Sequence, residues 1–593
     1  MKGSRKWLWV ACFFLLVAAR AAAQQPKGPE PADTVVLHGK IYTVNPRQAW
    51  AEALAIRDGK ILSVGSNQEI KRFRGPATRV IDARGRLVLP GFTDCHIHFL
   101  SGSISLGQVN LEGARTVAEI QQRVKAYAVA HGGNAWILGR GWTYPVFGAV
   151  ALPHKKFLDE VMPDRPVLLE GFDGHTSWAN SRALELAGLT RETPDPPNGV
   201  IVRDPQTGEA TGALKEAAAE LVERIVPKPT RAEKLAALRA GLTAANRAGV
   251  VRVHSAGGDF EGLELLDELR RSGGLTVRMY IAYFLDPPEL KQETVQIIEE
   301  ARRRYNGEWI SAGAVKTMLD GVVESHTAAM LAPYADDPTV SGKLFWDAAK
   351  YKAAIAELDR RGFQVFTHAI GDAAVRLALD AYEQAQRANG TRDARPRIEH
   401  IETITAADIP RFATLGVIAS FQPLHAYPED DTLKVWAPNA GKDRESRGFA
   451  WRSVLDSGGR LAFGSDWPVV TLNPWEGLQN AVTRQTVEGQ PPGGWVPEQR
   501  VSLAQAIEAY TLGAAIAGRR EKTEGSLERG KLADLIIVSQ NILEIDPRAI
   551  GKTEVLMTMV GGKIVYQSAG WQASGLATDS GAAPISVEAE ASR

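Results

Sequence analysis

The feature that most constrains the fold is a repeated alternation of short apolar runs with amphipathic helical segments through the middle of this 593-residue chain. Helical periodicity separates several of the runs, at 116–130, 231–248 and 348–361. Repeated β-α units of this number and length favour an α/β fold, a closed (β/α)8 TIM-like barrel, over an open sheet. The runs that suit buried parallel strands are 166–171, 250–254, 277–284, 310–319, 364–368, 397–400, 417–421 and 461–464.

The two ends of the chain resemble each other. A Gly-Lys-Ile triplet begins at Gly39, Gly59 and Gly562, and each triplet opens an apolar run after a turn. Segments 34–89 and 525–568 are therefore expected to build one small composite β-sandwich, and the barrel is expected to span 90–524. Two independent edge hairpins are the alternative.

One proline-rich stretch, 190–230, interrupts the alternation. Within it, 199–203 and 210–214 flank the turn-forming sequence 204–208 and predict a β-hairpin. We expect an insertion near the barrel mouth, and a simple surface excursion is the alternative. The tail 573–593 is rich in Ala, Gly and Ser and is expected to be disordered.

Residues 1–23 have the parts of a secretory signal peptide: basic residues, a short apolar core and the small-residue site Ala21-Ala22-Ala23. The apolar core is too short to span a membrane comfortably. We therefore expect an exported protein, periplasmic or secreted, with no stable membrane insertion after cleavage. An uncleaved anchor is the alternative. Cys95 would be the only cysteine left, which excludes an intramolecular disulfide.

The charge balance argues against nucleic acid as a partner. The chain has 69 basic and 69 acidic side chains and no basic patch stands out. A small molecule is the expected partner, and the sequence leaves open whether the chain forms a homo-oligomer.

His96 and His98 follow the apolar run 87–90. Side chains alternate between the faces of a strand, so the two imidazoles point the same way. Two converging imidazoles at the end of a buried strand are half of a divalent-metal site. The alternative is a pair that only lines a polar cleft.

Four further polar residues lie at the ends of apolar runs or within one, namely Lys316, His368, His400 and Asp466. Active sites of barrels of this kind lie where the strands end. Each residue alone has a structural explanation: a hydrogen-bonded core histidine, a capping aspartate or a salt-bridged lysine. Six such residues in one predicted barrel favour a shared metal site.

The motifs resemble those of the amidohydrolase superfamily, and most closely its amidohydrolase-3 (YtcJ-like) family, related to N-substituted formamide deformylase. The resemblance covers nearly all of the chain after the signal peptide. The motifs that carry it are His96-Ile97-His98, Val315-Lys316 with Asp320-Gly321, 367–372, Glu399-His400, Gly464-Ser465-Asp466, and Asp173-Gly174-His175 with Trp178 and Asn180.

The resemblance implies a β-sandwich with a metal-bearing barrel. It implies that His96, His98 and Asp466 hold one divalent cation, that His368 and His400 hold a second, and that a carboxylated Lys316 bridges them. Two zinc ions are expected, because imidazole and carboxylate ligands suit zinc. Iron, manganese and nickel remain open. The chain departs from its relatives at Thr143-Tyr144 and at His326, which bears on substrate choice.

The expected chemistry is attack of a metal-activated hydroxide on a carbonyl carbon. Asp466 is the expected general base and then acid. His175 is the candidate donor to the tetrahedral oxyanion, with a purely structural role as the alternative, and His254 is a weaker candidate. Aromatic residues expected at the mouth suggest a hydrophobic substrate pocket, unless they pack a seam between barrel and insertion. They are Trp142, Tyr144, Phe147, Trp178, Phe421 and Trp467.

These expectations predict an enzyme that hydrolyses carbon–nitrogen bonds other than peptide bonds, in amides or N-formyl and N-acyl amines. The same ligands would serve a hydrolase of lactones, carbamates or cyclic imides, or a deaminase. A binding protein that has lost its chemistry is the alternative from another class, and the presence of every ligand argues against it.

Overall fold

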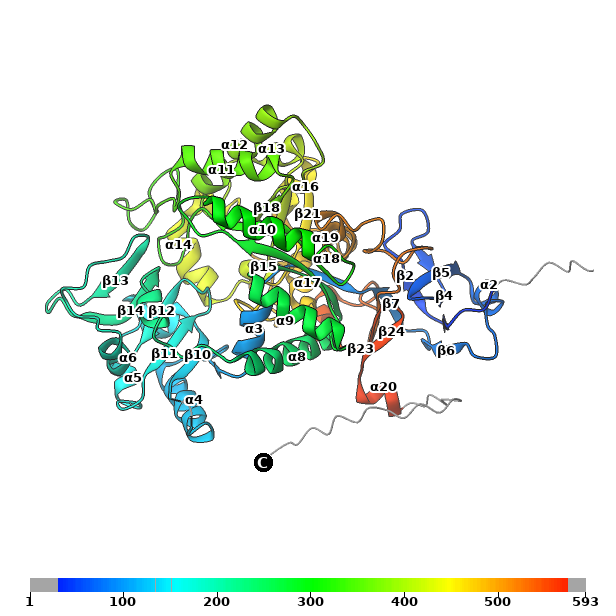
Figure 1. The fold of residues 1–593 in the computed structure, drawn as a ribbon, viewed down its shortest axis with the longest axis horizontal. Helices are drawn as coiled ribbons and strands as arrows, with labels where there is room; N and C mark the ends of the chain where they lie inside the picture. Colours follow the sequence, from blue (N-terminus) through cyan, green and yellow to red (C-terminus); the bar gives the residue numbers. More distant parts are fainter. Residues whose placement is uncertain (1–29, 134, 151, 574–593) are drawn as a thin grey trace, which may run out of the picture.

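The computed structural model describes residues 30–133, 135–150 and 152–573, which form three parts in a row (Figure 1). A barrel lies in the middle, an inserted sheet flanks it on one side, and a β-sandwich lies on the other. The predicted signal peptide at 1–23 lies outside the described residues, as does all but the first residue of the tail at 573–593. No helix within the described part of the chain is both long and apolar enough to cross a membrane.

The central sheet is the predicted barrel of eight parallel strands. It closes where the chain after its last strand meets its first: Asp466 N donates to His96 O at 2.7 Å, and His98 N donates to Trp467 O at 2.8 Å. The strands, in order around the barrel, are β8 (Phe92–Ile97), β15 (Val250–Gly258), β16 (Arg278–Phe284), β17 (Ile310–Met318), β18 (Gln364–Ala369), β19 (Arg397–His400), β20 (Ile418–Phe421) and β21 (Arg460–Phe463).

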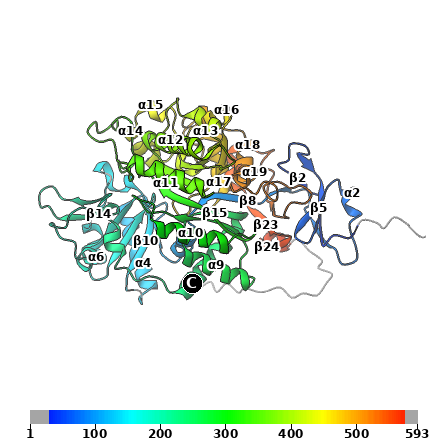
Figure 2. The same cartoon turned by 45° about the horizontal axis from the view of Figure 1, so that its top comes forward.

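Helices cover the outside of the barrel (Figures 1 and 2). The helix α8 shows why they form where they do: Thr230 caps its first turn by accepting from Glu233 N, and Gly249 ends it at a φ of 83°. The helices of this part are α3 (Phe99–Ser105), α8 (Arg231–Ala248), α9 (Phe260–Arg271), α10 (Gln292–Arg304), α11 (Ala348–Arg360), α12 (Asp372–Asn389), α13 (Ile409–Leu415), α14 (Ala437–Ala440), α15 (Lys442–Glu445), α16 (Trp451–Asp456), α17 (Pro474–Thr483), α18 (Leu503–Tyr510) and α19 (Leu512–Ala517), with short turns η2 (Pro423–Ala426), η3 (Asp431–Trp436), η4 (Pro497–Gln499) and η5 (Pro547–Lys552).

Both ends of the described chain build the β-sandwich. Strand β22 from the C-terminal segment pairs antiparallel with β7 from the N-terminal segment, with Leu535 opposite Pro90. Buried apolar side chains from both segments, such as Val36 and Met557, form one core. One sheet holds β1 (Thr34–Leu37), β4 (Ala53–Arg57), β5 (Lys60–Gly65) and β6 (Arg79–Asp82), and the other holds β2 (Lys40–Tyr42), β3 (Trp50–Ala51), β7 (Leu87–Pro90), β22 (Leu535–Val538), β23 (Val555–Val560) and β24 (Lys563–Gln567), with α2 (Asn67–Lys71) and α20 (Ala569–Ala573) alongside.

The inserted sheet lies between α3 and α8 along the chain, and it is larger than the predicted 190–230 segment. That segment supplies the predicted hairpin, β13 paired antiparallel with β14, but the sheet begins at Val109. Its members are β9 (Val109–Asn110), β10 (Ile137–Trp142), β11 (Val167–Gly171), β12 (Thr176–Ala179), β13 (Gly199–Arg203) and β14 (Ala210–Glu216), with α4 (Val117–Ala130), η1 (Tyr144–Val150), α5 (Lys156–Asp159), α6 (Ser181–Leu186) and α7 (Glu220–Glu223).

The run 166–171 was expected as a barrel strand, and this expectation is wrong. It forms β11, which pairs with β10 and β12 in the inserted sheet. A short apolar run has the same pattern in any buried sheet, so periodicity alone could not assign it.

Candidate metal centre

The carboxyl ends of the barrel strands bring the six predicted ligands to one end of the barrel. His96 lies in β8 and His98 directly follows it, Lys316 lies in β17, His368 in β18 and His400 at the end of β19. Asp466 comes shortly after β21. The shared direction of the parallel strands produces this convergence.

The Asp466 carboxylate is the centre of the cluster. Its Oδ1 lies 3.3 Å from His96 Nε2 and 3.2 Å from His98 Nε2. Its Oδ2 lies 3.8 Å from His400 Nδ1 and 3.5 Å from His425 Nε2. Two groups of three side chains, joined by Asp466, therefore have ligand atoms close enough to hold a metal ion.

The donor atoms of this cluster fit a divalent cation. Four of them are buried without a hydrogen-bond partner among the described residues, and such atoms are costly unless a ligand satisfies them. Imidazole nitrogens and a carboxylate oxygen are the ligands that Zn²⁺ and similar cations take in proteins. The four atoms are His96 Nε2, His400 Nδ1, His425 Nε2 and Asp466 Oδ1.

The ionisation states of three of the predicted ligands also suit a cation. Burial lowers the pKa of His400 and of His368 well below the usual range, so both imidazoles are neutral at pH 7. Burial opposes ionisation of Asp466, but His96 and His98 hold the pKa of its carboxyl well below its usual range. Neutral imidazole and ionised carboxylate are the forms that bind metal.

Sequence reasoning missed His425. It lies in the turn η2, four residues after the end of β20, and its ring stacks on that of His400 with centroids 5.5 Å apart. The predicted ligands were residues in the apolar runs or at their ends, although the loops that follow barrel strands open on the same face. Its place in the loop after the seventh strand could have identified it.

His368 and Lys316 lie beside this cluster. The His368 ring is 4.4 Å from that of His400, and its Nε2 is 3.2 Å from Gly321 O, which leaves Nδ1 for another ligand. Lys316 is 2% exposed and forms no ion pair within the described part of the chain. Burial lowers the pKa of the Lys316 ammonium.

Buried charges beneath the cluster orient His96. Glu399 Oε2 lies 2.6 Å from His96 Nδ1, and Arg397 donates to both oxygens of Glu399 at 2.8 and 3.0 Å. Burial opposes ionisation, but Arg397 and His96 lower the pKa of Glu399 to about 2. The fixed carboxylate leaves His96 Nε2 as the free nitrogen that faces Asp466.

Two of the ligands have strained backbones. Asp466 and His400 adopt φ angles of 64° and 75°, in the left-handed region that costs about 1–3 kcal/mol for residues other than glycine. Ile401, with a φ of 51°, follows His400 and donates its N–H to Ala369 O. Backbone strain of this kind gathers at functional sites because the surrounding structure holds it there.

The inserted sheet brings His175 over the barrel mouth. His175 lies in the turn between β11 and β12, and its ring centroid is 5.6 Å from that of His368. Its Nδ1 is 2.8 Å from Glu216 Oε2. Burial opposes protonation, but Glu216 raises the pKa of His175 to about 9, so the imidazole is a cationic donor at pH 7.

Three residues predicted to contact the substrate lie away from the barrel mouth. Trp142 and Trp178 are fully buried in the core of the inserted sheet, and Trp142 donates its indole N–H to Leu169 O. His254 is buried inside the barrel, where its Nδ1 is 3.0 Å from Arg397 Nη1. The structure thus places these three side chains in packed interiors, and their contact with a substrate stays a prediction.

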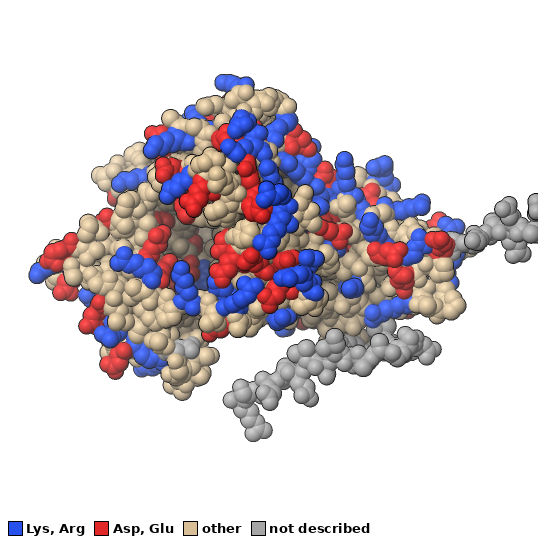
Figure 3. All heavy atoms as spheres, in the orientation of Figure 1, with Lys and Arg blue, Asp and Glu red and all other residues tan. Residues whose placement is uncertain are grey.

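Tyr144 and Trp467 lie closer to the expected places. Tyr144 lines a cavity between the inserted sheet and the barrel, and its hydroxyl donates to Asp173 at 2.6 Å. Trp467 follows Asp466 and packs on Phe99 with ring centroids 6.1 Å apart. Figure 3 shows a hollow between the inserted sheet and the barrel, with acidic and basic side chains around it.

Known proteins resemble this chain in sequence over nearly its whole length. A curated relative, protein LONG AFTER FAR-RED 3 of Arabidopsis thaliana, is 36% identical over 90% of this chain and 92% of its own length. The putative amidohydrolase YtcJ of Bacillus subtilis is 30% identical over 89% of this chain and 98% of its own. N-substituted formamide deformylase of Arthrobacter pascens is 27% identical over 91% of this chain and 99% of its own.

Solved structures agree with the fold. An uncharacterized metal-dependent hydrolase from Pyrococcus furiosus matches with a TM-score of 0.66 at 27% identity, over 87% of this chain and 99% of that one. The profile of the amidohydrolase family, Amidohydro_3, matches residues 79–566, which include all the residues of the cluster. The chain is therefore a member of the amidohydrolase family, whose enzymes are metal-dependent hydrolases.

Proposed function

We propose that this protein hydrolyses carbon–nitrogen bonds other than peptide bonds, in amides or in N-formyl and N-acyl amines. The observation that carries the proposal is the Asp466 carboxylate surrounded by imidazoles, three of which have a buried nitrogen without a hydrogen-bond partner among the described residues. The similarity to a formamide deformylase along nearly the whole chain supports this bond type.

The residues would hold two divalent cations, which we propose are zinc. His96, His98 and Asp466 are the ligands of one, and His400 and His425 with Asp466 are ligands of the other, next to His368. A carboxylated Lys316 would bridge them, since a lysine with a lowered pKa supplies the free amine that combines with carbon dioxide to give a carbamate and a proton. When bound, such cations make water acidic and polarise a carbonyl group.

The protein side chains would move the protons. Asp466, ionised and central, accepts the proton of the attacking water and delivers it to the leaving nitrogen. His175, cationic and held by Glu216, donates a hydrogen bond to the oxyanion that develops on the substrate carbonyl. Both groups lie on the side of the barrel where the loops leave a cavity.

The test is metal analysis of the purified full-length chain together with hydrolysis of a panel of formamides and N-acyl amines. We expect bound divalent metal, hydrolysis of at least one member of the panel, and loss of hydrolysis in Asp466→Asn. Turnover confined to lactones, carbamates, cyclic imides or amino-substituted heterocycles would overturn the bond type. Metal-free protein without any turnover would overturn the enzyme itself.

We also propose that the protein is exported after removal of residues 1–23. The support is the basic, apolar and small-residue pattern of that segment. N-terminal sequencing of the protein recovered outside the cytoplasm should begin at Gln24, and full-length protein retained in the cytoplasm would contradict export.

A further inference from the structure

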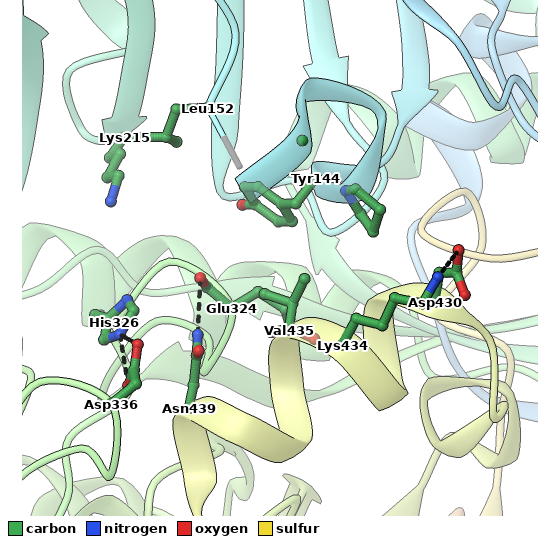
Figure 4. Close-up of a pocket in the computed structure, with 12 residues that line it drawn as sticks. Tyr144, Leu152, Lys215, Glu324, His326, Asp336, Asp430, Lys434, Val435 and Asn439 are labelled. Carbon is green, nitrogen blue, oxygen red and sulfur yellow. Dashed lines mark hydrogen bonds and ion pairs between the residues drawn. The ribbon is translucent and has the colours of Figure 1, made fainter. Parts of the chain in front are cut away.

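A cavity of about 610 Å³ separates the inserted sheet from the loops at the barrel mouth (Figure 4). The inserted part contributes one wall and the loops after β17 and β20 contribute the other. The residues that matter here are Tyr144 and Lys215 on the first wall, and Glu324, His326, Lys434 and Asn439 on the second.

Two side chains that line this cavity lead toward the residues that hold His175. Lys215 directly precedes Glu216, which binds His175. The Tyr144 hydroxyl donates to Asp173, and Asp173 also accepts the backbone N–H of His175 at 3.0 Å. A molecule in the cavity could therefore contact Tyr144, whose partner Asp173 also holds the proposed oxyanion donor, His175.

Among the described cations that line the cavity, Lys215 differs from the others in having no carboxylate partner. Lys434 pairs with Asp430 at 2.8 Å, and His326 pairs with Asp336 at 2.9 Å. Lys215 forms no ion pair with any described carboxylate, and its ammonium donates to Ser325 O at 3.2 Å. Figure 4 shows its side chain pointing from the strand into the cavity.

Glu216 and Asp173, the carboxylates that interact electrostatically with Lys215, already accept hydrogen bonds from other residues. Glu216 accepts from Thr327 at 2.6 Å and binds His175, and Asp173 accepts from Tyr144. Burial lowers the pKa of the Lys215 ammonium. A partly desolvated ammonium with free donor atoms is stabilised by an anion.

Glu324 offers a second donor on the opposite wall. Its Oε2 is buried and has no hydrogen-bond partner among the described residues. Burial, with the nearby carboxyl of Glu402, raises the pKa of Glu324 well above its usual range, which favours the protonated carboxyl. A protonated carboxyl donates a hydrogen bond to a carboxylate.

We propose that this cavity binds a carboxylate group of the substrate, held by Lys215 and by Glu324. The inference rests on the proposed hydrolase function and narrows it. The substrate would be an amide or an N-formyl or N-acyl amine that carries a carboxylate away from the bond that is cleaved. Lys215 is then a specificity-determining residue.

The experiment compares two substrates with the metal-loaded full-length chain: 4-(formamidomethyl)benzoate and its uncharged carboxamide analogue. We expect kcat/KM to favour the benzoate by about tenfold or more, chiefly through KM. Lys215→Met should abolish this preference and Lys215→Arg should keep it. Lys434→Met, which removes a cation already paired on the same cavity, should keep it as well.

Equal kcat/KM for the two compounds in the unmodified protein, or equal loss of preference in the two methionine variants, would overturn the inference. If neither compound is hydrolysed, calorimetric titration of both still decides. Tighter binding of the benzoate that is lost in Lys215→Met supports the cavity assignment while the proposed bond type fails. Equal binding of the two compounds, or no binding of either, overturns the assignment.

Discussion

At the scale of single residues, the centre depends on histidines in which one ring nitrogen already has a hydrogen-bond partner outside the cluster. His96 is held through Nδ1 by Glu399, and His368 is held through Nε2 by Gly321 O. Each contact chooses which ring nitrogen faces the cluster. A ligand fixed in this way loses little conformational freedom when metal binds.

We expect Glu399→Gln to weaken metal binding by about 10- to 100-fold, because His96 loses the carboxylate that orients it and makes it more basic. Competition titration against a chromogenic chelator measures the affinity. Glu544→Gln is the matched control, since Glu544 pairs with Lys40 on the surface. An unchanged affinity in Glu399→Gln would show that the contact plays no part in ligation.

A second prediction concerns pH. Burial opposes the protonation of His175, but the carboxylate of Glu216 favours it more strongly and raises the pKa of His175 to about 9. The imidazole is therefore a cationic donor below about pH 9 and loses its charge above it. In Glu216→Gln the carboxylate that raises the pKa of His175 is gone. The alkaline limb of the kcat/KM profile should therefore move to lower pH. Glu209→Gln, which removes a carboxylate paired with Lys155 elsewhere in the same sheet, should leave the limb in place. An alkaline limb that does not move would exclude His175 as the donor.

At the scale of elements, the same contacts between β8 and the chain after β21 close the barrel and place Asp466. Asp94 in β8 accepts the backbone N–H of Ser465 at 2.9 Å and that of His96 at 3.2 Å. The chain after β21 can lie this close only because Gly464 has no side chain, since an added Cβ would be 2.8 Å from Asp94 Oδ1 and would clash with His96 N.

Gly464→Ala is therefore expected to lower the free energy of unfolding by about 1–3 kcal/mol through overpacking, and to displace Asp466 from the cluster. Urea unfolding and metal content measure the two effects. Gly132→Ala is the control, because an added Cβ there meets nothing within 4 Å. Full metal content and unchanged stability in Gly464→Ala would contradict this account.

At the scale of the whole molecule, buried ion pairs join the barrel to the sandwich. Arg278, the first residue of β16, is fully buried and donates to Asp534 at 2.9 Å, directly before β22. Arg252 in β15 pairs with Glu524, which directly precedes the C-terminal segment. A buried ion pair thus joins the C-terminal part of the sandwich to the barrel, while strand pairing joins it to the N-terminal part.

We expect Arg278→Ala to destabilise the protein by about 3–5 kcal/mol, because it leaves Asp534 buried without its cation. Chemical denaturation followed by fluorescence measures the loss. Arg231→Ala removes a surface pair with Glu268 and should leave the denaturation midpoint unchanged. Equal midpoints for the two variants would show that the buried pair contributes little.

Sequence periodicity predicted most of the fold because it is a local property. Seven of the eight predicted runs are barrel strands, and the strand with His96 completes the barrel. The run 166–171 was misplaced, because the choice of a partner strand is made across the fold. The size of the inserted sheet was missed for the same reason.

The chain by itself determined which side chains end the parallel strands, and therefore that imidazoles and Asp466 meet. That outcome follows from strand direction and from a two-residue side-chain period. Only the tertiary structure decided that His425 reaches the cluster from a loop, that Glu216 charges His175, and that Trp142 and Trp178 are core residues. Those properties depend on neighbours from distant segments, and the chain acquires these neighbours only when it is folded.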